Sequence, residues 1–380
     1  MIPYSTQDIN EVDIKAVVAV LRSEWLTQGP ALERFEKAIA KKVGAKFAVA
    51  FNSGTAALHA AYFAAGIGNG DEVVVPALTF AATANAALYL GAKPIFADSD
   101  IRTGNMSVAD TRKKITKKTK AIVPVDYGGR PAALREFRAL ARKHKLVFIE
   151  DAAQALGAEY RGKPVGAHAD MTMFSFHPVK SITTGEGGVI VTDNPKFDRA
   201  LRLFRSHGIS KDAKTFARKN HGEWYQEMQA LGFNYRMPEM SAALGESQLK
   251  RLASFILKRR AAARRYDMLL KNVPDLILPL CERMHEKSAW HLYPVRLASP
   301  IAHKRDEVFA KLRTAGIGVQ VHHVPVHTNI YYEKLGYKKG MCPFAEAFVA
   351  SEISIPLFPA ITVAQQKFIA GTLKRILASL

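Results

Sequence analysis

Short apolar runs alternate with segments of helical periodicity from about residue 46 to residue 191. The runs are nearly continuous in apolar and β-branched residues, which is typical of strands buried on both faces of a sheet. Strands and helices in alternation predict an α/β fold, a mostly parallel sheet with helices on both faces. The predicted strands are 47–51, 72–77, 93–98, 121–127, 146–151 and 171–176, and the predicted helices between them are 55–66, 82–91 and 132–145.

The pattern changes after residue 192. A helix over 197–208 is followed by a polar segment, 211–230, for which we predict mainly loops. A long helical pattern over 238–271 then leads into a tail of mixed strand and helix signals. We therefore predict a large domain over 1–245 and a smaller C-terminal α/β domain over 246–380, led in by the long helix. The elements predicted in the tail are strands at 291–297 and 317–324 and helices at 304–315 and 363–379.

Composition adds one unusual feature, the charge. Lys and Arg number 54 against 34 for Asp and Glu, a net charge of +20, while 48% hydrophobic residues suffice for a core and exclude a disordered chain. The excess fits nucleic acid, an anionic membrane surface or an anionic substrate. The densest basic runs, RKKITKKTK (112–120) and KRRAAARR (258–265), carry no nucleic-acid-binding signature. We interpret them mainly as solvated surface and expect no nucleic-acid partner; a basic nucleic-acid-binding protein is the alternative class.

Cysteine usage and the chain start bear on the compartment. Cys281 and Cys342 are too few for a disulfide framework or a zinc site, which fits a reducing compartment. The first residues lack a basic stretch before an apolar one, and no window reaches 18 uninterrupted apolar residues. We expect a cytoplasmic protein with no membrane partner and no metal.

The polar residues that end the predicted strands are the candidate site, because ligands of open α/β sheets bind beyond the carboxyl ends of the strands. The first strand is followed by Asn52, Ser53, Gly54 and Thr55 and then by a helix. Free N–H groups and the positive end of the helix dipole favour a phosphate there. Ser and Thr are also ordinary helix caps, so this feature alone leaves both interpretations open.

Two further strand ends carry charge. The strand at 146–151 ends in Glu150 and Asp151, and a buried acid needs a partner, either in a salt bridge or in a protonated ring nitrogen. Ser175 lies near the end of the strand at 171–176, and Lys180 follows in a glycine-bounded loop. Burial lowers the pKa of an ammonium group, and a neutral lysine can form a Schiff base with a carbonyl. The turn that favours a phosphate, the acid at the strand end and the lysine in the glycine-bounded loop together indicate a pyridoxal phosphate (PLP) site.

Motifs over nearly the whole chain resemble, in consistent order, those of the DegT/StrS-type nucleotide-sugar aminotransferases, which are fold-type-I PLP enzymes. The resemblance implies a fold-type-I large domain with a mostly parallel mixed sheet and a smaller C-terminal α/β domain. The matching motifs are WLTQGP (25–30), NSGTAALHAA (52–61), LTFAATANA (78–86), VDYGGRPA (125–132), IEDAAQALGAEY (149–160), FSFHPVKSITTGEGG (174–188), FRSHG (204–208), GFNYRM (232–237) and GIGVQVHHVPVH (316–327).

The resemblance also assigns roles at the cofactor. It makes Lys180 the lysine that binds PLP covalently and Asp151 the partner of the pyridinium nitrogen. Gln154 would approach the ring hydroxyl, and Phe80 would stack on the ring, a role that its aromatic face permits.

Phosphate and sugar contacts follow from the same resemblance. Ser175 and the amides of Thr55 and Ala56 would bind the cofactor phosphate, and Asn234 would reach the phosphate of the neighbouring subunit, so a homodimer is expected. The residues implied at the nucleotide sugar are Tyr4, Glu24, Trp25, Leu26, Thr27, Ser53, Ser175, Asn234, Arg236, His322, His323, Val324 and Pro325.

The wording of several motifs is most similar to family members of pseudaminic acid synthesis. These would move an amino group from L-glutamate to C4 of a 4-keto-6-deoxy UDP-N-acetyl-hexose in a ping-pong reaction. A UDP-4-amino-4-deoxy-L-arabinose-type transaminase, or another nucleotide-sugar aminotransferase, is the alternative. A sugar dehydratase on the same scaffold is disfavoured, because those relatives carry histidine where Lys180 stands.

Overall fold

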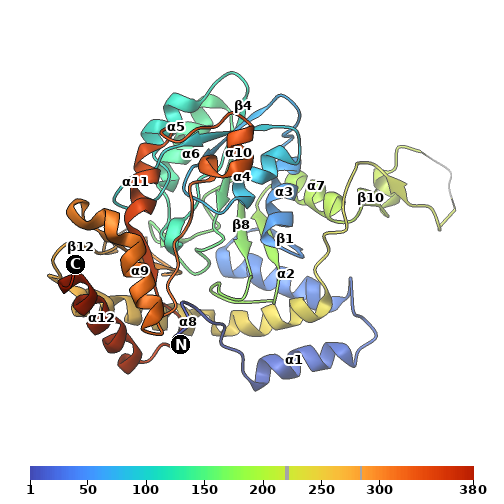
Figure 1. Ribbon diagram of the computed structural model, residues 1–380. Coiled ribbons are helices and arrows are strands. Elements are labelled where there is room, and N and C mark those ends of the chain that lie inside the picture. Colours follow the sequence, from blue (N-terminus) through green and yellow to red (C-terminus); the bar gives the residue numbers. More distant parts are fainter. Residues whose placement is uncertain (219–221, 283–284) are drawn as a thin grey trace.

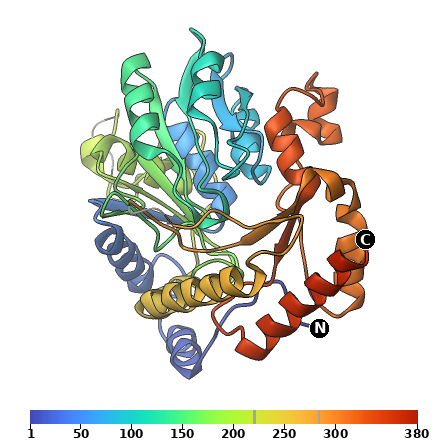
Figure 2. The same ribbon diagram turned by 90° about the vertical axis from the view of Figure 1, so that its left-hand side faces the viewer.

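The computed structural model describes residues 1–218, 222–282 and 285–380. Its centre is a seven-stranded sheet of order β1-β9-β8-β5-β4-β2-β3, in which β9 is antiparallel to both neighbours and the other adjacent pairs are parallel. This confirms the predicted mostly parallel sheet, which lies between layers of helices (Figures 1 and 2). The strands are β1 (Phe47–Phe51), β2 (Glu72–Pro76), β3 (Lys93–Ala97), β4 (Thr119–Ile122), β5 (Val147–Asp151), β8 (Met171–Ser175) and β9 (Gly188–Thr192).

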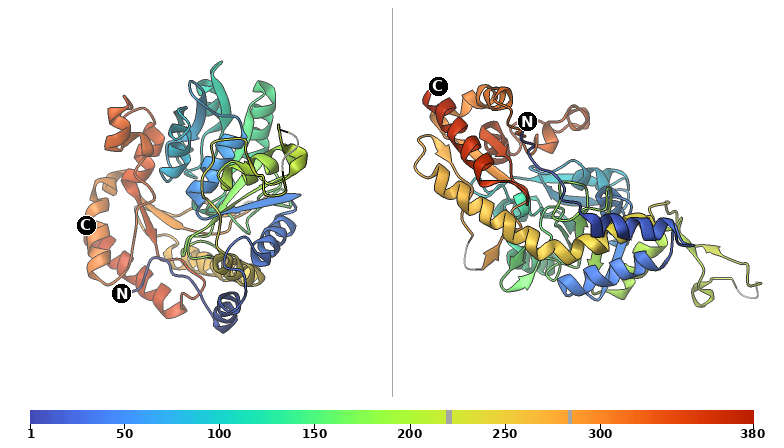
Figure 3. Two further views of the ribbon diagram at one scale, coloured as in Figure 1. Left: turned by 90° about the vertical axis from the view of Figure 1, so that its right-hand side faces the viewer. Right: turned by 90° about the horizontal axis from the view of Figure 1, so that it is seen from below.

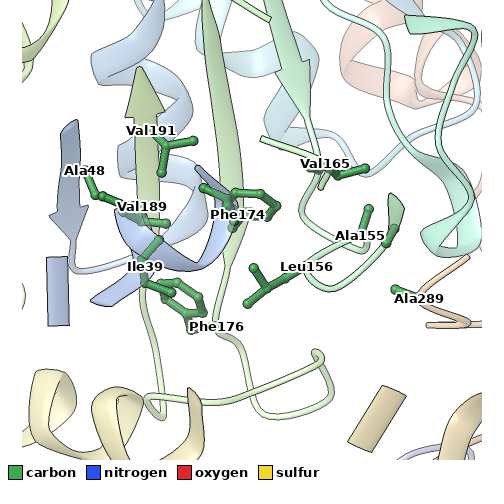
Figure 4. Close-up of a cluster of buried hydrophobic side chains, with 14 of the residues drawn as sticks. Ile39, Ala48, Ala155, Leu156, Val165, Phe174, Phe176, Val189, Val191 and Ala289 are labelled. Carbon is green, nitrogen blue, oxygen red and sulfur yellow. The ribbon is translucent and has the colours of Figure 1, made fainter. Parts of the chain in front are cut away.

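Alternate side chains of these strands enter two clusters of buried hydrophobic residues, one on each face of the sheet. In β1, Ala48 and Ala50 belong to one cluster, and Val49 and Phe51 belong to the other. Figure 4 shows part of the first cluster, where side chains of β8 and β9 meet Ile39. The helices of this large unit are α1 (Glu11–Leu21), α2 (Pro30–Val43), α3 (Gly54–Ala64), α4 (Ala82–Leu88), α5 (Val108–Lys114), α6 (Leu134–His144) and α7 (Pro195–Arg205).

Helix α8 (Glu239–Leu270) joins the large unit to the C-terminal unit and runs along the base of the molecule (Figures 1 and 3). Its first half packs into the large core through Leu252, and its second half packs into a third cluster through Tyr266. One helix serves both cores, so the division placed at residue 245 stays a prediction. The other elements of the C-terminal part are β12 (Leu276–Ile277), β14 (Tyr293–Leu297), β15 (Glu352–Ile355), α9 (Arg305–Thr314), α10 (Ile330–Lys334), α11 (Pro343–Ser351) and α12 (Val363–Ala378).

The strand predicted at 317–324 is wrong. Only single bridges form there, from Ile317 to Ile2 and from Gln320 to Ser354, so the segment runs between the N-terminus and β15 without a regular ladder. The edge position in the C-terminal sheet, of order β12-β14-β15, belongs instead to β15. Because β15 has only four residues, Glu-Ile-Ser-Ile, its alternation of polar and apolar residues is too short to predict a strand.

A hairpin arm built on β10 (Ile209–Ser210) and β11 (Glu227–Met228) extends away from the large unit (Figures 1 and 3). It contains most of the polar segment predicted at 211–230, of which residues 219–221 lie outside the described part. A second small sheet joins β13 (Glu286–Lys287), β6 (Glu159–Tyr160) and β7 (Lys163–Pro164). Within the three described ranges, no helix is long and apolar enough to cross a bilayer.

Candidate active site

The carboxyl ends of five strands, β1, β2, β4, β5 and β8, open into one cavity of about 570 Å3. This is where ligands of open α/β sheets bind. The lining residues fall into two groups. The sheet-edge wall comprises Ser53, Gly54, Thr55, Asp151, Gln154, Ser175 and Lys180, and the tail wall, drawn from segments outside the large sheet, comprises Tyr4, His291, His322 and His323.

Lys180 lies in the loop between β8 and β9. Its backbone N–H donates to the His177 carbonyl at 2.9 Å, and the Thr184 N–H closes the loop on Phe176 at 3.0 Å. The side chain is half-buried and lines the cavity. Burial lowers the pKa of its amine to about 8, the nearby Asp151 opposes this shift, and the positive Arg259 adds to it. A neutral amine is therefore accessible near neutral pH.

Asp151 ends β5 and is only 3% exposed. Its carboxylate accepts a hydrogen bond from the Thr83 hydroxyl at 2.7 Å and another from the Ala153 N–H at 3.1 Å. Burial raises the pKa of this carboxyl, while Thr83, Ala153 and the charge of Lys180 lower it. A cation placed against Asp151 would remove much of the cost of burying the charged form.

The first turn of α3 offers free donors to the cavity. Ser53 caps the helix, with its hydroxyl oxygen accepting the Ala56 N–H at 3.1 Å. That amide, predicted at the phosphate, is thus already engaged. The N–H groups of Gly54 and Thr55 make no hydrogen bond to any residue in the described ranges.

Close backbone packing fixes this turn beside β8 and β9. A Cβ added at Gly188 would lie 2.6 Å from the Ser53 carbonyl oxygen and 2.7 Å from the Gly54 Cα, so only glycine fits there. A Cβ at Gly54 would lie 3.2 Å from the Cβ of Ser175. The Ser175 hydroxyl therefore lies next to the helix start, and its role at a phosphate stays a prediction.

Two more predicted cofactor residues line the cavity. The Gln154 Oε1 accepts the Gly128 N–H at 2.6 Å, which leaves its Nε2 as a donor. Phe80 is 63% exposed, and its ring centroid lies 5.8 Å from that of His323. An exposed aromatic ring beside a polar cavity provides a stacking surface.

The tail wall consists of aromatic and imidazole rings. The Tyr4 and His322 ring centroids lie 5.4 Å apart, and those of His322 and His323 lie 4.9 Å apart. Burial, with the charge of Lys180 adding to it, lowers the pKa of His322 to about 3 and that of His323 to about 4. The same two causes hold the pKa of His291 well below its usual value. These rings are therefore neutral at physiological pH.

The remaining predicted substrate residues do not line this cavity. Glu24 to Thr27 are exposed between α1 and α2, and Asn234, also exposed, lies at the base of the arm, where its carbonyl receives a 3.5 Å contact from the Asn52 side-chain amide. The others that lie elsewhere are Arg236, Val324 and Pro325. Roles for these residues in the site of the same chain stay predictions.

Three polar residues of the site escaped sequence reasoning, namely Thr83, Arg259 and His291. Thr83 looked like a helix residue, although it positions Asp151. Arg259 belongs to a basic run interpreted as surface, yet it is 1% exposed. Its spacing from the apolar Phe255, Ala262 and Ala263 on one helical face was the available signal. The Arg259 guanidinium donates to the backbone carbonyls of Val179, Trp290, His291 and Leu357.

The groups present fit PLP. A lysine amine of lowered pKa, a buried carboxylate that forms no ion pair within the described ranges, and free amides at the start of α3 surround one cavity. They match the aldehyde, the ring nitrogen and the phosphate of that cofactor.

Comparison with known proteins agrees with this chemistry. The model of the DegT/DnrJ/EryC1/StrS aminotransferase family matches residues 7–374. The spore coat polysaccharide biosynthesis protein SpsC of Bacillus subtilis is 40% identical over 366 residues, covering 95% of this chain and 93% of the relative. The UDP-4-amino-4,6-dideoxy-N-acetyl-beta-L-altrosamine transaminase of Campylobacter jejuni is 39% identical over 380 residues, covering 99% of this chain and 98% of the relative.

Solved structures give the same result. Helicobacter pylori PseC, an aminotransferase of pseudaminic acid biosynthesis, superposes with a TM-score of 0.92 at 34% identity and covers 100% of both chains. The PLP form of a putative sugar aminotransferase from Streptococcus pneumoniae superposes with a TM-score of 0.93 at 30% identity, covering 100% of this chain and 99% of that one. The fold is thus that of fold-type-I aminotransferases, and the chain belongs to the DegT/DnrJ/EryC1/StrS aminotransferase family.

Proposed function

We propose that the protein is a PLP-dependent nucleotide-sugar aminotransferase that moves the amino group of L-glutamate to C4 of a 4-keto-6-deoxy UDP-N-acetyl-hexose. The observation that carries the reaction class is the placement of Lys180 and Asp151 in one cavity of an aminotransferase-family chain. The assignment of the sugar substrate is supported by the motifs similar to those of pseudaminic acid synthesis and by the 39% identity to the altrosamine transaminase. A UDP-4-amino-4-deoxy-L-arabinose-type enzyme is the competing assignment, and SpsC, at 40% identity, has a different named role.

The side chains divide the chemistry between them. PLP, when bound, withdraws electrons from the carbon that carries the nitrogen and makes its proton acidic. Lys180, with an amine pKa of about 8, can take up this proton and return it. Asp151 would keep the ring nitrogen protonated by offering it a carboxylate. Ser175 and the free amides of Gly54 and Thr55 would bind the phosphate.

The tail wall suits an uncharged sugar. Oxygens of the sugar can hydrogen-bond to the neutral ring of His323, to the Tyr4 hydroxyl and to the one His322 ring nitrogen that Ser354 does not engage. The net charge of +20 favours capture of the anionic diphosphate at long range.

The arm supports a homodimer with shared sites. Trp224 and Leu231 on the arm are 79% and 75% exposed, and large apolar side chains so exposed on a projecting hairpin suit burial by a partner. Asn234, at the base of this arm, does not line the cavity of its own chain. Its proposed contact with the cofactor phosphate therefore requires the site of a second copy.

Mixing two inactive variants tests this arrangement. Lys180→Ala and Asn234→Ala proteins, refolded together, form mixed dimers in which one site has both intact residues if Asn234 acts across the interface. Turnover then recovers to roughly a quarter of wild type, because about half of the dimers are mixed. No recovery, or sedimentation that shows an active monomer, would contradict the shared site.

Product analysis tests the function itself. The protein, PLP and L-glutamate are incubated with a panel of UDP- and dTDP-keto-sugars, and NMR locates any new C–N bond. We expect an amine at C4 of the 4-keto-6-deoxy UDP-N-acetyl-hexose and an equal amount of 2-oxoglutarate, with neither product from Lys180→Ala. Preferred amination of the UDP-4-keto-arabinose sugar would overturn the substrate assignment, and no amination of any sugar would overturn the reaction class.

A further inference from the structure

A chain of three polar side chains leads from the tail wall into the C-terminal unit. The Nδ1 atom of His322 lies 2.9 Å from the Ser354 hydroxyl, and that hydroxyl lies 2.5 Å from Oε1 of Glu352. The second oxygen of Glu352, Oε2, accepts the backbone N–H of His322 at 2.9 Å. All three residues are buried, with exposed fractions of 8%, 1% and 0% from His322 to Glu352.

The fold aligns these residues through β15. Glu352 and Ser354 are two positions apart on this strand, so their side chains point to the same face. The backbones of Gln320 and Ser354 exchange two hydrogen bonds, at 2.8 and 3.2 Å, which bring the segment with His322 alongside. Tyr127 fixes the other side, where its hydroxyl donates to the His322 carbonyl at 2.6 Å.

His322, at one end of this row of three side chains, faces the substrate cavity. His322 lines the cavity, and its Nδ1 is engaged by Ser354. The other ring nitrogen, Nε2, makes no hydrogen bond within the described ranges and is not among their buried polar atoms without a partner. It is therefore the nitrogen left for a ligand.

Counting protons gives this chain two states. Because Oε2 accepts an N–H, any proton on Glu352 lies on Oε1. A protonated Glu352 donates to Ser354, Ser354 donates to Nδ1, and Nε2 of His322 then carries the ring hydrogen. An ionised Glu352 accepts from Ser354, Ser354 accepts from Nδ1–H, and Nε2 becomes an acceptor. Each state is fully hydrogen-bonded, and neither requires an imidazolium.

We propose that Glu352, Ser354 and His322 form a proton relay that gives Nε2 of His322 the role of acid and base at the carbonyl oxygen of the sugar. This inference rests on the proposed function. When nitrogen replaces oxygen at the sugar carbon, a C–N bond forms, the C–O bond breaks, and the oxygen leaves as water. Both protons of that water come from the nitrogen of the incoming amine.

The relay moves one of these two protons. Nε2–H gives its proton to the oxygen, Nδ1 takes the Ser354 proton, and Ser354 takes the Glu352 proton, which leaves a carboxylate. The relay returns to its first state when the amine nitrogen, now bonded to the sugar carbon, releases its proton to Nε2 of His322.

Burial and the surrounding charges favour a relay in which the imidazole ring of His322 stays neutral. Burial raises the pKa of Glu352 to about 8, and Ser354, the His322 N–H and Arg305 lower it. Burial, with the charges of His323 and Lys180 adding to it, lowers the pKa of His322 to about 3. The other groups near Glu352 are Tyr127, whose pKa burial and Glu352 both raise, and Arg296, which stands opposite Glu352 in the backbone register of β14 and β15.

Nitrogen NMR of protein labelled with 15N-histidine reads the relay without substrate. His322 is one of 12 histidines, and its signals are assigned by their loss in His322→Asn. Between about pH 6 and about pH 10 we expect His322 to change from the Nε2–H to the Nδ1–H tautomer, with a midpoint near that of Glu352. A tautomer that does not change, or one that changes identically in Ser354→Ala, overturns the relay.

Kinetics on the loaded enzyme give a second measurement. Ser354→Ala should lower kcat by about tenfold or more, with KM for the keto-sugar changed less than about threefold. Ser351→Ala is the matched control, because within the described ranges this buried hydroxyl donates hydrogen bonds only to the carbonyls of Ala347 and Phe348. An unchanged kcat in Ser354→Ala contradicts the relay. Failure to aminate any sugar contradicts the proposed function instead, while the NMR result stands.

Discussion

The sheet-edge wall and the tail wall face the same cavity, but their polar groups differ in charge and in support. Lys180 and Asp151 are a cation and an anion that each favour the charged form of the other; Asp151 ends β5, and Lys180 lies in the closed loop that follows β8. His322 and His323 are neutral rings, supplied by a segment without a regular ladder. Charge is thus concentrated where the sheet holds the backbone, and hydrogen-bonding capacity lies where distant segments meet. A cofactor needs the first, and a variable sugar suits the second.

The largest expected effect is the loss of kcat when Lys180 of the sheet-edge wall is replaced, compared with replacement of His323 in the tail wall. Lys180→Ala should lower kcat by about 10³-fold or more, because no other group of the sheet-edge wall can move the substrate proton. His323→Ala should lower kcat/KM by about 10- to 100-fold, mainly through KM for the sugar. Steady-state measurement of 2-oxoglutarate release compares them. Equal losses of kcat in the two variants would show that the walls do not divide the work in this way.

Arg259 lies behind both walls, so its removal should disturb both. Arg259→Met leaves four backbone carbonyls without their donor, and we expect the free energy of unfolding to fall by about 2–4 kcal/mol in urea titrations. The pKa of the Lys180 amine should rise, because a positive neighbour is lost. Arg264→Met, an exposed position on the same helix, should change stability by less than about 0.5 kcal/mol. Similar losses in both variants would contradict the buried role of Arg259.

Carboxyl groups beneath the sheet-edge wall should make stability depend on pH. Burial raises the pKa of Glu150 from 4.5 to about 7, and Thr172, Asp126 and Arg138 oppose this shift. The folded protein therefore holds a proton that the unfolded chain releases, and stability falls as pH rises from about 4.5 to about 7. Glu150→Gln should make this decline shallower, by on the order of 1 kcal/mol across the window. An unchanged slope in urea titrations would show that Glu150 is ionised when buried.

The smallest effect is expected in the basic run that lies outside both walls. Lys117 and Lys118 are exposed and form no ion pair within the part of the chain that the structure describes. Replacing both with Ser should change kcat/KM less than about twofold at moderate salt and stability by less than about 0.5 kcal/mol. A larger, salt-dependent loss of kcat/KM would mean that this run steers the substrate.

The two walls also differ in what sequence reasoning could predict. Asp151 ends one buried strand and Lys180 follows another, and the local signals of strand end and glycine turn place both at the same edge of the sheet. The relay escaped prediction because His322 and Ser354 are 32 residues apart and meet only through the pairing of Gln320 with Ser354. Arg259 escaped because its neighbours in sequence are basic, whereas burial depends on the helical face.

Peptide mapping of the protein with PLP bound tests the central claim most directly. Reduction with borohydride fixes a covalently held cofactor on its lysine, and mass spectrometry of the peptides then identifies the residue. The structure predicts one pyridoxyl phosphate adduct, on the peptide that contains Lys180, and none in Lys180→Ala. An adduct on another lysine, or no adduct from a protein saturated with PLP, would contradict the assignment of this cavity as the active site.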